Sequence, residues 1–148
     1  MDGIERILVQ HECIGLDAAI FIYYIEDVLP FSTVAKIVFD ELERGTFAGV
    51  TSVVTLMEIL VKPFELGQSN RVAGYEMLLS HYPHLTIAEI TNNVARRAAQ
   101  LRAMYRLRPP DALHLGTALE NGATAFVTND MGLRRVRELS IIMLSDFV

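Results

Sequence analysis

Residues 108–130 read RPPDALHLGTALENGATAFVTND, and this stretch predicts one helix followed by one buried strand. Pro110 suits the first turn of a helix, because the N–H that proline lacks has no partner there in any case. The apolar residues that follow recur at helical spacing, and Asn121-Gly122 favours a left-handed end to the helix. The short run 125–128 is apolar enough for a strand that is covered on both faces.

The two elements of this stretch each carry a carboxylate near one end. Asp111 falls in the first turn of the helix, and Asp130 comes just after the strand. In open α/β sheets, ligands bind outside the carboxyl ends of the strands. Asp130 is therefore expected where chemistry usually occurs in such a sheet, and the helix could bring Asp111 beside it. Taken alone, Asp111 is also a favourable first-turn acid and Asp130 an ordinary turn residue.

Strands alternate with helices along the rest of the chain, which predicts a parallel sheet with helices on both faces and right-handed crossovers. The strands are expected at 13–17, 47–54, 85–90, 125–128 and 141–144. The other helices are expected at 3–11, 20–26, 33–44, 56–61, 71–81, 92–106 and 133–139. Ser32 can cap the third of these helices, and Pro63 is expected to end the fourth. We expect a single domain over 1–148, with 1–12 as a helical N-terminal extension.

Composition narrows the class of protein. The 148 residues suffice for one real core, and a mean hydropathy of +0.31 hints at apolar surface hidden in an oligomer. The single cysteine, Cys13, excludes an intrachain disulfide. No signal peptide is evident, and the longest apolar run, 18–25, is too short to span a bilayer. We therefore expect a cytoplasmic protein without a membrane segment.

Charge is unevenly distributed. The net charge of −5 argues against a general nucleic-acid binder. However, residues 1–90 carry 5 basic and 13 acidic side chains, whereas residues 91–148 carry 8 basic and 5 acidic. All eight basic residues of the second part are arginines. Such asymmetry indicates either a side that faces phosphate or a set of solvated helix faces.

Two further acids stand out in the first half of the chain. Asp17 closes the first strand, where its simplest role is to cap the following helix. Glu58 interrupts the apolar run 53–61, and a buried carboxylate needs a partner or a metal, although a surface-facing Glu58 remains possible. A doubly wound sheet could gather these two acids with Asp111 and Asp130. Carboxylates that are crowded together stay ionised only if a cation lies among them. Oxygen ligands suit Mg²⁺ or Mn²⁺. Such an ion can activate a water molecule for attack on a phosphodiester.

At four places the chain resembles a PIN domain, and in particular a VapC-like ribonuclease toxin of a toxin–antitoxin pair. The similar segments, each of which carries one of these four acids, are 16–26, 51–58, 110–119 and 126–130. The resemblance runs from about Ile14 to the C-terminus, so it covers nearly the whole chain. It implies a three-layer α/β/α sandwich around a central, mainly parallel sheet of about five strands.

The resemblance also implies a function and a site. The function is metal-dependent hydrolysis of RNA phosphodiester bonds, with Mg²⁺ or Mn²⁺ as cofactor and frequently a homodimer held with an antitoxin protein. The implied catalytic and metal-binding acids are Asp17, Glu58, Asp111 and Asp130. Polar neighbours that could hold a water, an acid or a phosphate are Ser52, Thr128, Asn129, Arg108 and Arg134. His114 would be a packing or supporting residue rather than a general base.

Other classes of function have specific requirements. A PIN-like module that binds RNA or protein without catalysis need not keep four acids. An aspartyl phosphatase needs a second Asp two residues after Asp17, where Ala19 stands, and a response-regulator receiver needs a late lysine, although none follows Lys62. The phosphate-binding loop motifs GxxxxGK and GxGxxG are missing, and Cys13 has no evident partner for thiol catalysis.

Overall fold

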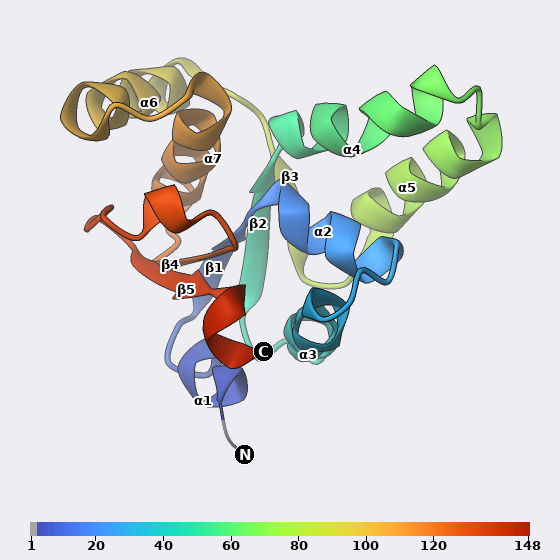
Figure 1. The fold of residues 1–148 in the computed structure, drawn as a ribbon. Helices are drawn as coiled ribbons and strands as arrows, with labels where there is room; N and C mark the ends of the chain where they lie inside the picture. Colours follow the sequence, from blue (N-terminus) through green and yellow to red (C-terminus); the bar gives the residue numbers. More distant parts are fainter. Residues whose placement is uncertain (1–2) are drawn as a thin grey trace.

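A parallel β-sheet forms the centre of the computed structural model, which describes residues 3–148 (Figure 1). The strands are β1 (Cys13–Leu16), β2 (Ala48–Ser52), β3 (Leu85–Ala88), β4 (Ala125–Thr128) and β5 (Ser140–Met143). Their order is β3-β2-β1-β4-β5, and every neighbouring pair runs parallel. The predicted five-stranded sheet is therefore confirmed, and it is wholly parallel.

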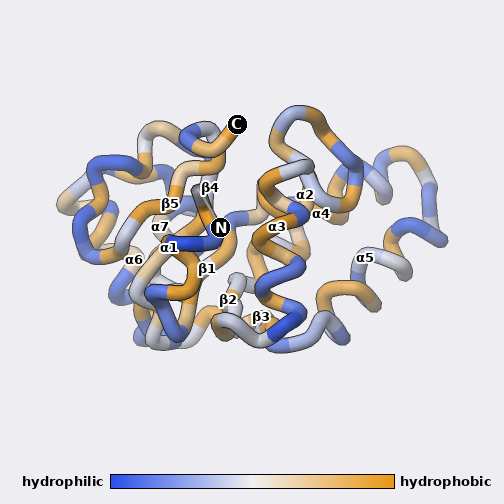
Figure 2. Tube along the Cα trace, turned by 90° about the horizontal axis from the view of Figure 1, so that it is seen from below, coloured by the Kyte–Doolittle hydropathy of each residue, from blue (hydrophilic) through white to orange (hydrophobic). Residues whose placement is uncertain are grey.

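Helices cover both faces of this sheet. They are α1 (Ile4–Leu8), α2 (Ala18–Ile25), α3 (Phe31–Glu43), α4 (Val53–Glu65), α5 (Ser69–His81), α6 (Asn92–Tyr105) and α7 (Pro109–Glu120), with 3₁₀ turns η1 (Met131–Leu133) and η2 (Leu144–Phe147). Helices α6 and α7 lie on one side of the sheet, and α2 and α3 on the other (Figures 1 and 2). This is the predicted α/β/α sandwich.

Each face of the sheet contributes to its own core, as strand β4 shows. Ala125 and Val127 belong to the core with α1, α2 and α3, whereas Phe126 belongs to the core with α6 and α7. Alternate residues of a strand point to opposite faces, and here both faces are covered. This explains why 125–128 is almost wholly apolar, since all its residues are buried.

Glycines allow α7 to lie unusually close to its neighbours. A Cβ on Gly15 would stand 2.6 Å from Ala118 Cβ and 2.7 Å from a ring carbon of Phe126. A Cβ on Gly116 would stand 3.1 Å from the backbone oxygen of Val94 in α6. A side chain at Gly15 would force its neighbours to shift, and one at Gly116 would crowd the backbone of α6. Helix α7, which carries Asp111, is therefore held tightly between β1 and α6.

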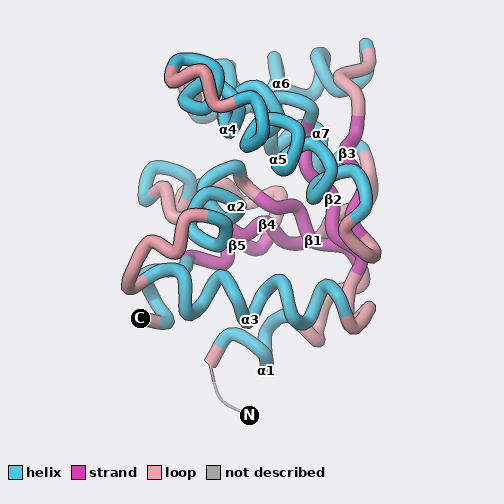
Figure 3. Tube along the Cα trace, turned by 90° about the vertical axis from the view of Figure 1, so that its right-hand side faces the viewer, coloured by secondary structure: helices cyan, strands magenta, loops and turns pink. Residues whose placement is uncertain are grey.

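Several element boundaries differ from the prediction. Ser32 is a buried residue inside α3 and does not cap it, since the helix starts at Phe31. Helix α4 begins directly after β2, because the Ser52 side chain accepts a hydrogen bond from the Val54 backbone and so caps the helix. The helix also continues through Pro63, because this proline lies near the C-terminal end, where it removes a single hydrogen bond. The helices α4 and α5 follow each other as a helical pair beside α2 (Figure 3).

The helix predicted over 133–139 is wrong. Only a 3₁₀ turn forms at Met131–Leu133, where the Asp130 side chain accepts a hydrogen bond from the Gly132 backbone. The apolar residues Val136 and Leu139 are buried in the core with α6 and α7 without helical backbone, so their spacing reflects burial alone.

The N-terminal helix is shorter than predicted. It spans Ile4–Leu8, and its buried residues pack against α3. Residues 1–2 of the expected extension lie outside the described part of the chain. Within residues 3–148, no helix has the length and apolar character that a membrane crossing requires.

Candidate active site

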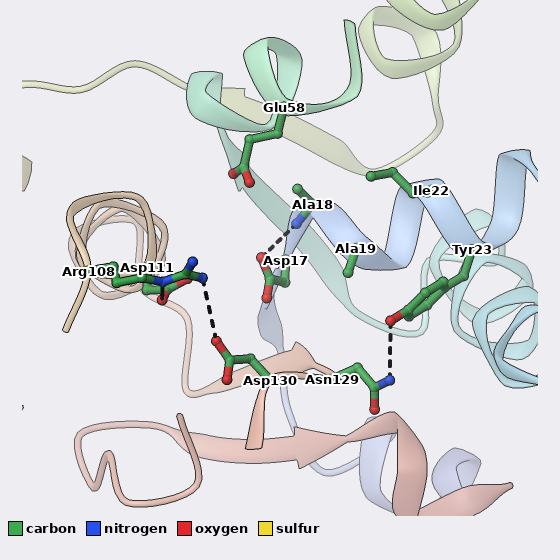
Figure 4. A pocket seen from close by; sticks show the side chains of 10 residues that line it. All are labelled: Asp17, Ala18, Ala19, Ile22, Tyr23, Glu58, Arg108, Asp111, Asn129 and Asp130. Atoms are coloured by element: carbon green, nitrogen blue, oxygen red, sulfur yellow. Dashed lines mark hydrogen bonds and ion pairs between the residues drawn. The ribbon is translucent and has the colours of Figure 1, made fainter. Parts of the chain in front are cut away.

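Four carboxylates border one open cavity of about 260 Å³ at the carboxyl edge of the sheet (Figure 4). Asp17 follows β1, Glu58 comes from α4, Asp111 lies in the first turn of α7, and Asp130 follows β4. Strands β1 and β4 are paired neighbours, with Leu16 opposite Val127. The parallel topology therefore delivers the acids at the ends of these two strands to the same place.

The side chain of Asp17 is largely buried at the edge of this cavity. One carboxylate oxygen accepts a hydrogen bond from the Ala18 backbone at 2.8 Å, and the other accepts from the Thr128 hydroxyl at 2.6 Å. The Thr128 hydroxyl also accepts from the backbone N–H of Asp130 at 3.1 Å. Burial raises the pKa of Asp17, the hydrogen bond from Thr128 opposes this, and the negative charge of Asp111 adds to it. Asp17 thus caps α2 and borders the cavity at once.

Glu58 reaches the cavity from a different layer of the fold. Its Oε1 lies 2.5 Å from Nε2 of His114, a residue of α7 that is 3% exposed. The same Nε2 lies 4.0 Å from Asp17 Oδ1. The carboxylate of Glu58 is itself partly exposed. The acid within the apolar run 53–61 therefore faces solvent on one side and contacts a buried imidazole on the other.

Arg108 is the cation of the cavity. Its Nε donates to Asp111 Oδ2 at 3.2 Å, and its Nη2 lies 4.0 Å from Asp130 Oδ2. The negative charge of Asp111 is the main reason that the pKa of Arg108 is raised further. The guanidinium is well exposed, so its ion pairs are weak and the side chain can exchange one oxygen partner for another.

Comparison with known proteins decides the family. A family model described as PIN domain matches residues 14–139. The chain belongs to the PIN domain family. No curated protein matches the sequence, so the other similarities are to solved structures.

The fold of this PIN domain is similar to that of solved toxin–antitoxin structures. A toxin–antitoxin complex from Klebsiella pneumoniae has a chain with a TM-score of 0.67 and 23% identity, over 88% of this chain and 97% of that one. A chain of DNA-bound VapBC from Salmonella typhimurium has a TM-score of 0.68 and 21% identity, over 88% of this chain and 97% of that one. A chain of VapBC2 from Rickettsia felis, bound to a promoter DNA fragment, has a TM-score of 0.65 and 17% identity, over 88% of this chain and 98% of that one. At these identities the likeness shows the fold.

The other predicted site residues divide into two groups. Asn129 borders the cavity of the PIN domain, where it donates to the Tyr23 hydroxyl at 3.2 Å and accepts from the Ser145 backbone. Thr128 contacts Asp17 as described. Ser52 is buried at the start of α4 and does not border the cavity. Arg134 also lies outside the lining and is paired with Asp146 at 2.6 Å.

The sequence alone names no partner for two residues of this PIN domain. Tyr23 borders the cavity and accepts the hydrogen bond of Asn129, and His114 contacts Glu58. The only sequence signal for His114 is its position three residues after Asp111, which puts both on neighbouring parts of the helix surface. No local pattern links it to Glu58.

The donor set of the cavity suits a hard divalent cation. Four carboxylates supply oxygen ligands, which Mg²⁺ and Mn²⁺ prefer, and the cavity is open to water for the remaining positions. Within residues 3–148, however, no three acid, imidazole or thiol groups already stand close enough to enclose an ion. In this arrangement the guanidinium of Arg108 lies beside Asp111 and Asp130. The oxygen chemistry of these side chains fits such an ion.

Proposed function

We propose that this PIN domain protein is a Mg²⁺- or Mn²⁺-dependent endoribonuclease and the toxin of a toxin–antitoxin pair. The observation that carries the proposal is the convergence of four carboxylates from four separate elements on one open cavity. Its fold is similar to chains of solved toxin–antitoxin complexes, which supports a protein antitoxin as partner. The substrate in this proposal is RNA, and the setting is the cytoplasm.

The four acids have distinct parts in the proposed reaction. When bound, the divalent ion supplies Lewis acidity, which activates water and stabilises negative charge at the phosphodiester. Asp17, Asp111 and Asp130 hold the ion at the edge of the sheet and on the tightly packed α7. Glu58 completes the ligand set from α4. An acid oxygen that is not engaged with the ion can take the proton of the attacking water.

Exposed apolar residues offer a surface to the proposed protein partners. Met57, Val61 and Phe64 lie on one face of α4 at helical spacing, and each is about half exposed or more. Such contiguous apolar surface typically marks a protein–protein interface. It supports the proposed homodimer and antitoxin contact, and sedimentation of the purified chain alone would give its oligomeric state.

Metal-dependent cleavage is the first test of this proposal. Purified protein without antitoxin is incubated with a mixture of labelled RNAs in Mg²⁺, in Mn²⁺ and in EDTA. We expect cleavage with either ion and none with EDTA, because the acids then lack the cation that they hold. Circular dichroism shows that the protein is folded in each buffer. A folded protein that cleaves equally well in EDTA contradicts the metal-dependent reaction, and one that cleaves no RNA favours a binding module.

Arg108 provides a prediction with two opposite effects. We expect Arg108→Gln to bind Mn²⁺ a few-fold more tightly, because a cation that competes for Asp111 and Asp130 is gone. We expect it to raise the KM for RNA. We also expect the slope of log KM against log salt concentration to fall by about one, the value that corresponds to one lost phosphate contact. Calorimetric titration with Mn²⁺ and cleavage at several KCl concentrations measure the two effects.

Arg134→Gln is the matched comparison for Arg108→Gln. Arg134 lies outside the cavity lining and is paired with Asp146, so its removal should leave Mn²⁺ affinity unchanged and alter KM less. If both variants change Mn²⁺ affinity equally, the effect comes from overall charge, and the assignment of Arg108 to the cavity is wrong.

A further inference from the structure

We propose that His114 is a positioning residue that orients Glu58 for the divalent ion, and that it neither binds the ion nor acts as a base. This inference rests on the proposed function, since it concerns the same site. Its basis is the contact between His114 Nε2 and Glu58 Oε1, which joins a residue of α7 to the acid of α4 across 56 positions of sequence.

The surroundings of His114 fix the imidazole ring. The residue is 3% exposed, and its helix is held by the close approach of Gly15 to Ala118 and of Gly116 to α6. Its Nε2 faces Glu58 Oε1 at 2.5 Å, and the next acid, Asp17, lies at 4.0 Å. The imidazole ring is therefore shielded from solvent, has little room to move, and lies next to the acids of the cavity.

The second ring nitrogen identifies the donor. Nδ1 of His114 is buried and has no hydrogen-bond partner within the described residues. A proton on Nδ1 would be a buried donor without an acceptor, which is costly. The ring hydrogen therefore belongs on Nε2, where it is donated to Glu58. A ring used in this way has no accessible nitrogen left to coordinate an ion in the cavity.

Glu58 is the acid that most needs such an anchor. Asp17 and Asp130 accept backbone hydrogen bonds next to their strands, and Asp111 is paired with Arg108. The long side chain of Glu58 is partly exposed, and within residues 3–148 its carboxylate has a hydrogen bond only from His114. Holding a flexible carboxylate before the ion arrives removes an ordering cost from binding, as groups behind metal ligands generally do.

Two amide variants separate the hydrogen bond from the volume of the ring. In His114→Gln the amide nitrogen falls close to the place of Nε2, so it can still donate to Glu58. In His114→Asn the amide nitrogen falls close to the place of Nδ1 and cannot reach Glu58. We expect His114→Asn to bind Mn²⁺ about tenfold more weakly than the parent, and His114→Gln to stay within about threefold of it. Calorimetric titration without RNA measures both affinities, and thermal unfolding shows that both variants fold.

A double-mutant cycle tests whether His114 acts through Glu58. If it does, adding His114→Asn to Glu58→Gln causes no further loss of Mn²⁺ affinity, whereas additive losses overturn the inference. Equal affinities of the Asn and Gln variants also overturn it. In the parent protein, nitrogen NMR of the ring should show the hydrogen on Nε2. A hydrogen on Nδ1 overturns the inference even where His114→Asn fails to fold.

The binding assay keeps this inference distinct from the proposed function. A parent protein that binds Mn²⁺ but cleaves no RNA contradicts the ribonuclease proposal, and the affinities of the variants still decide the part of His114. A parent protein that binds no Mn²⁺ overturns the positioning role, whatever it does to RNA.

Discussion

The Asp17→Asn variant is expected to cleave RNA at least about a hundredfold more slowly than the parent, because a preorganised charge at the reacting centre is lost. The amide keeps the shape of the carboxyl group. Its oxygen can still accept from the Ala18 backbone, and its nitrogen can donate to the Thr128 hydroxyl, which then acts as acceptor. Initial cleavage rates of the two proteins at saturating Mn²⁺ measure the loss.

The stability of this variant shows that the loss is chemical. Burial raises the pKa of Asp17, so the ionised carboxylate destabilises the fold, and this cost shrinks as the pH falls below the raised pKa and is absent below the ordinary pKa of an aspartate. Without metal at neutral pH, we therefore expect Asp17→Asn to melt at the same temperature as the parent or higher, with the difference closing in acid. Asp130→Asn should lose cleavage as well. Asp40→Asn should not, because Asp40 is a partly exposed residue of α3 that pairs with Lys36 outside the cavity lining. If both cavity variants cleave normally, the assigned site is wrong.

The Phe39→Ala variant is expected to lose about 3–5 kcal/mol of unfolding free energy. Phe39 is 1% exposed and lies at the centre of an aromatic cluster. Its ring centroid stands 4.5 Å from that of Tyr24, 5.1 Å from that of Phe21 and 5.4 Å from that of Tyr82. Truncation removes these contacts and leaves a cavity between α2, α3 and the residues that follow α5.

Urea denaturation measures this loss of stability. The matched control is Met104→Ala, because Met104 is a large apolar residue with 66% of its surface exposed, and its truncation should change stability by less than about 0.5 kcal/mol. A loss below about 1 kcal/mol in Phe39→Ala would contradict the described packing of α3 on the sheet.

Local patterns are sufficient to predict the sheet and the edge at which the acids gather. The apolar run of β4 and the acid that follows it can be recognised directly, because a strand buried on both faces is mostly apolar. The alternation of strands and helices then implies parallel pairing, and parallel strands share a carboxyl edge. This topology alone predicts that Asp17 and Asp130 lie at the same edge.

Contacts between distant residues could not be predicted in this way. The hydrogen bond between His114 and Glu58 and the ion pair of Arg134 with Asp146 depend on how separate elements pack, and neither leaves a local signal. Val136 and Leu139 show a related limit, since their spacing suits a helix although burial alone accounts for it. Pro63 shows that a helix breaker near a helix end does not decide the boundary.

The central pairing of β1 with β4 has a consequence for the order of events during synthesis. Asp17 and the Thr128 hydroxyl that bonds to it are separated by 111 positions, and Asp111 and Asp130 also come from the last third of the chain. Contacts between residues so far apart in sequence form slowly. Until these late residues have left the ribosome, Asp17 lacks both the hydroxyl that holds it and two of the acids that share its cavity. Under the proposed ribonuclease function, the growing chain therefore has no assembled site while the message that encodes it is still being translated.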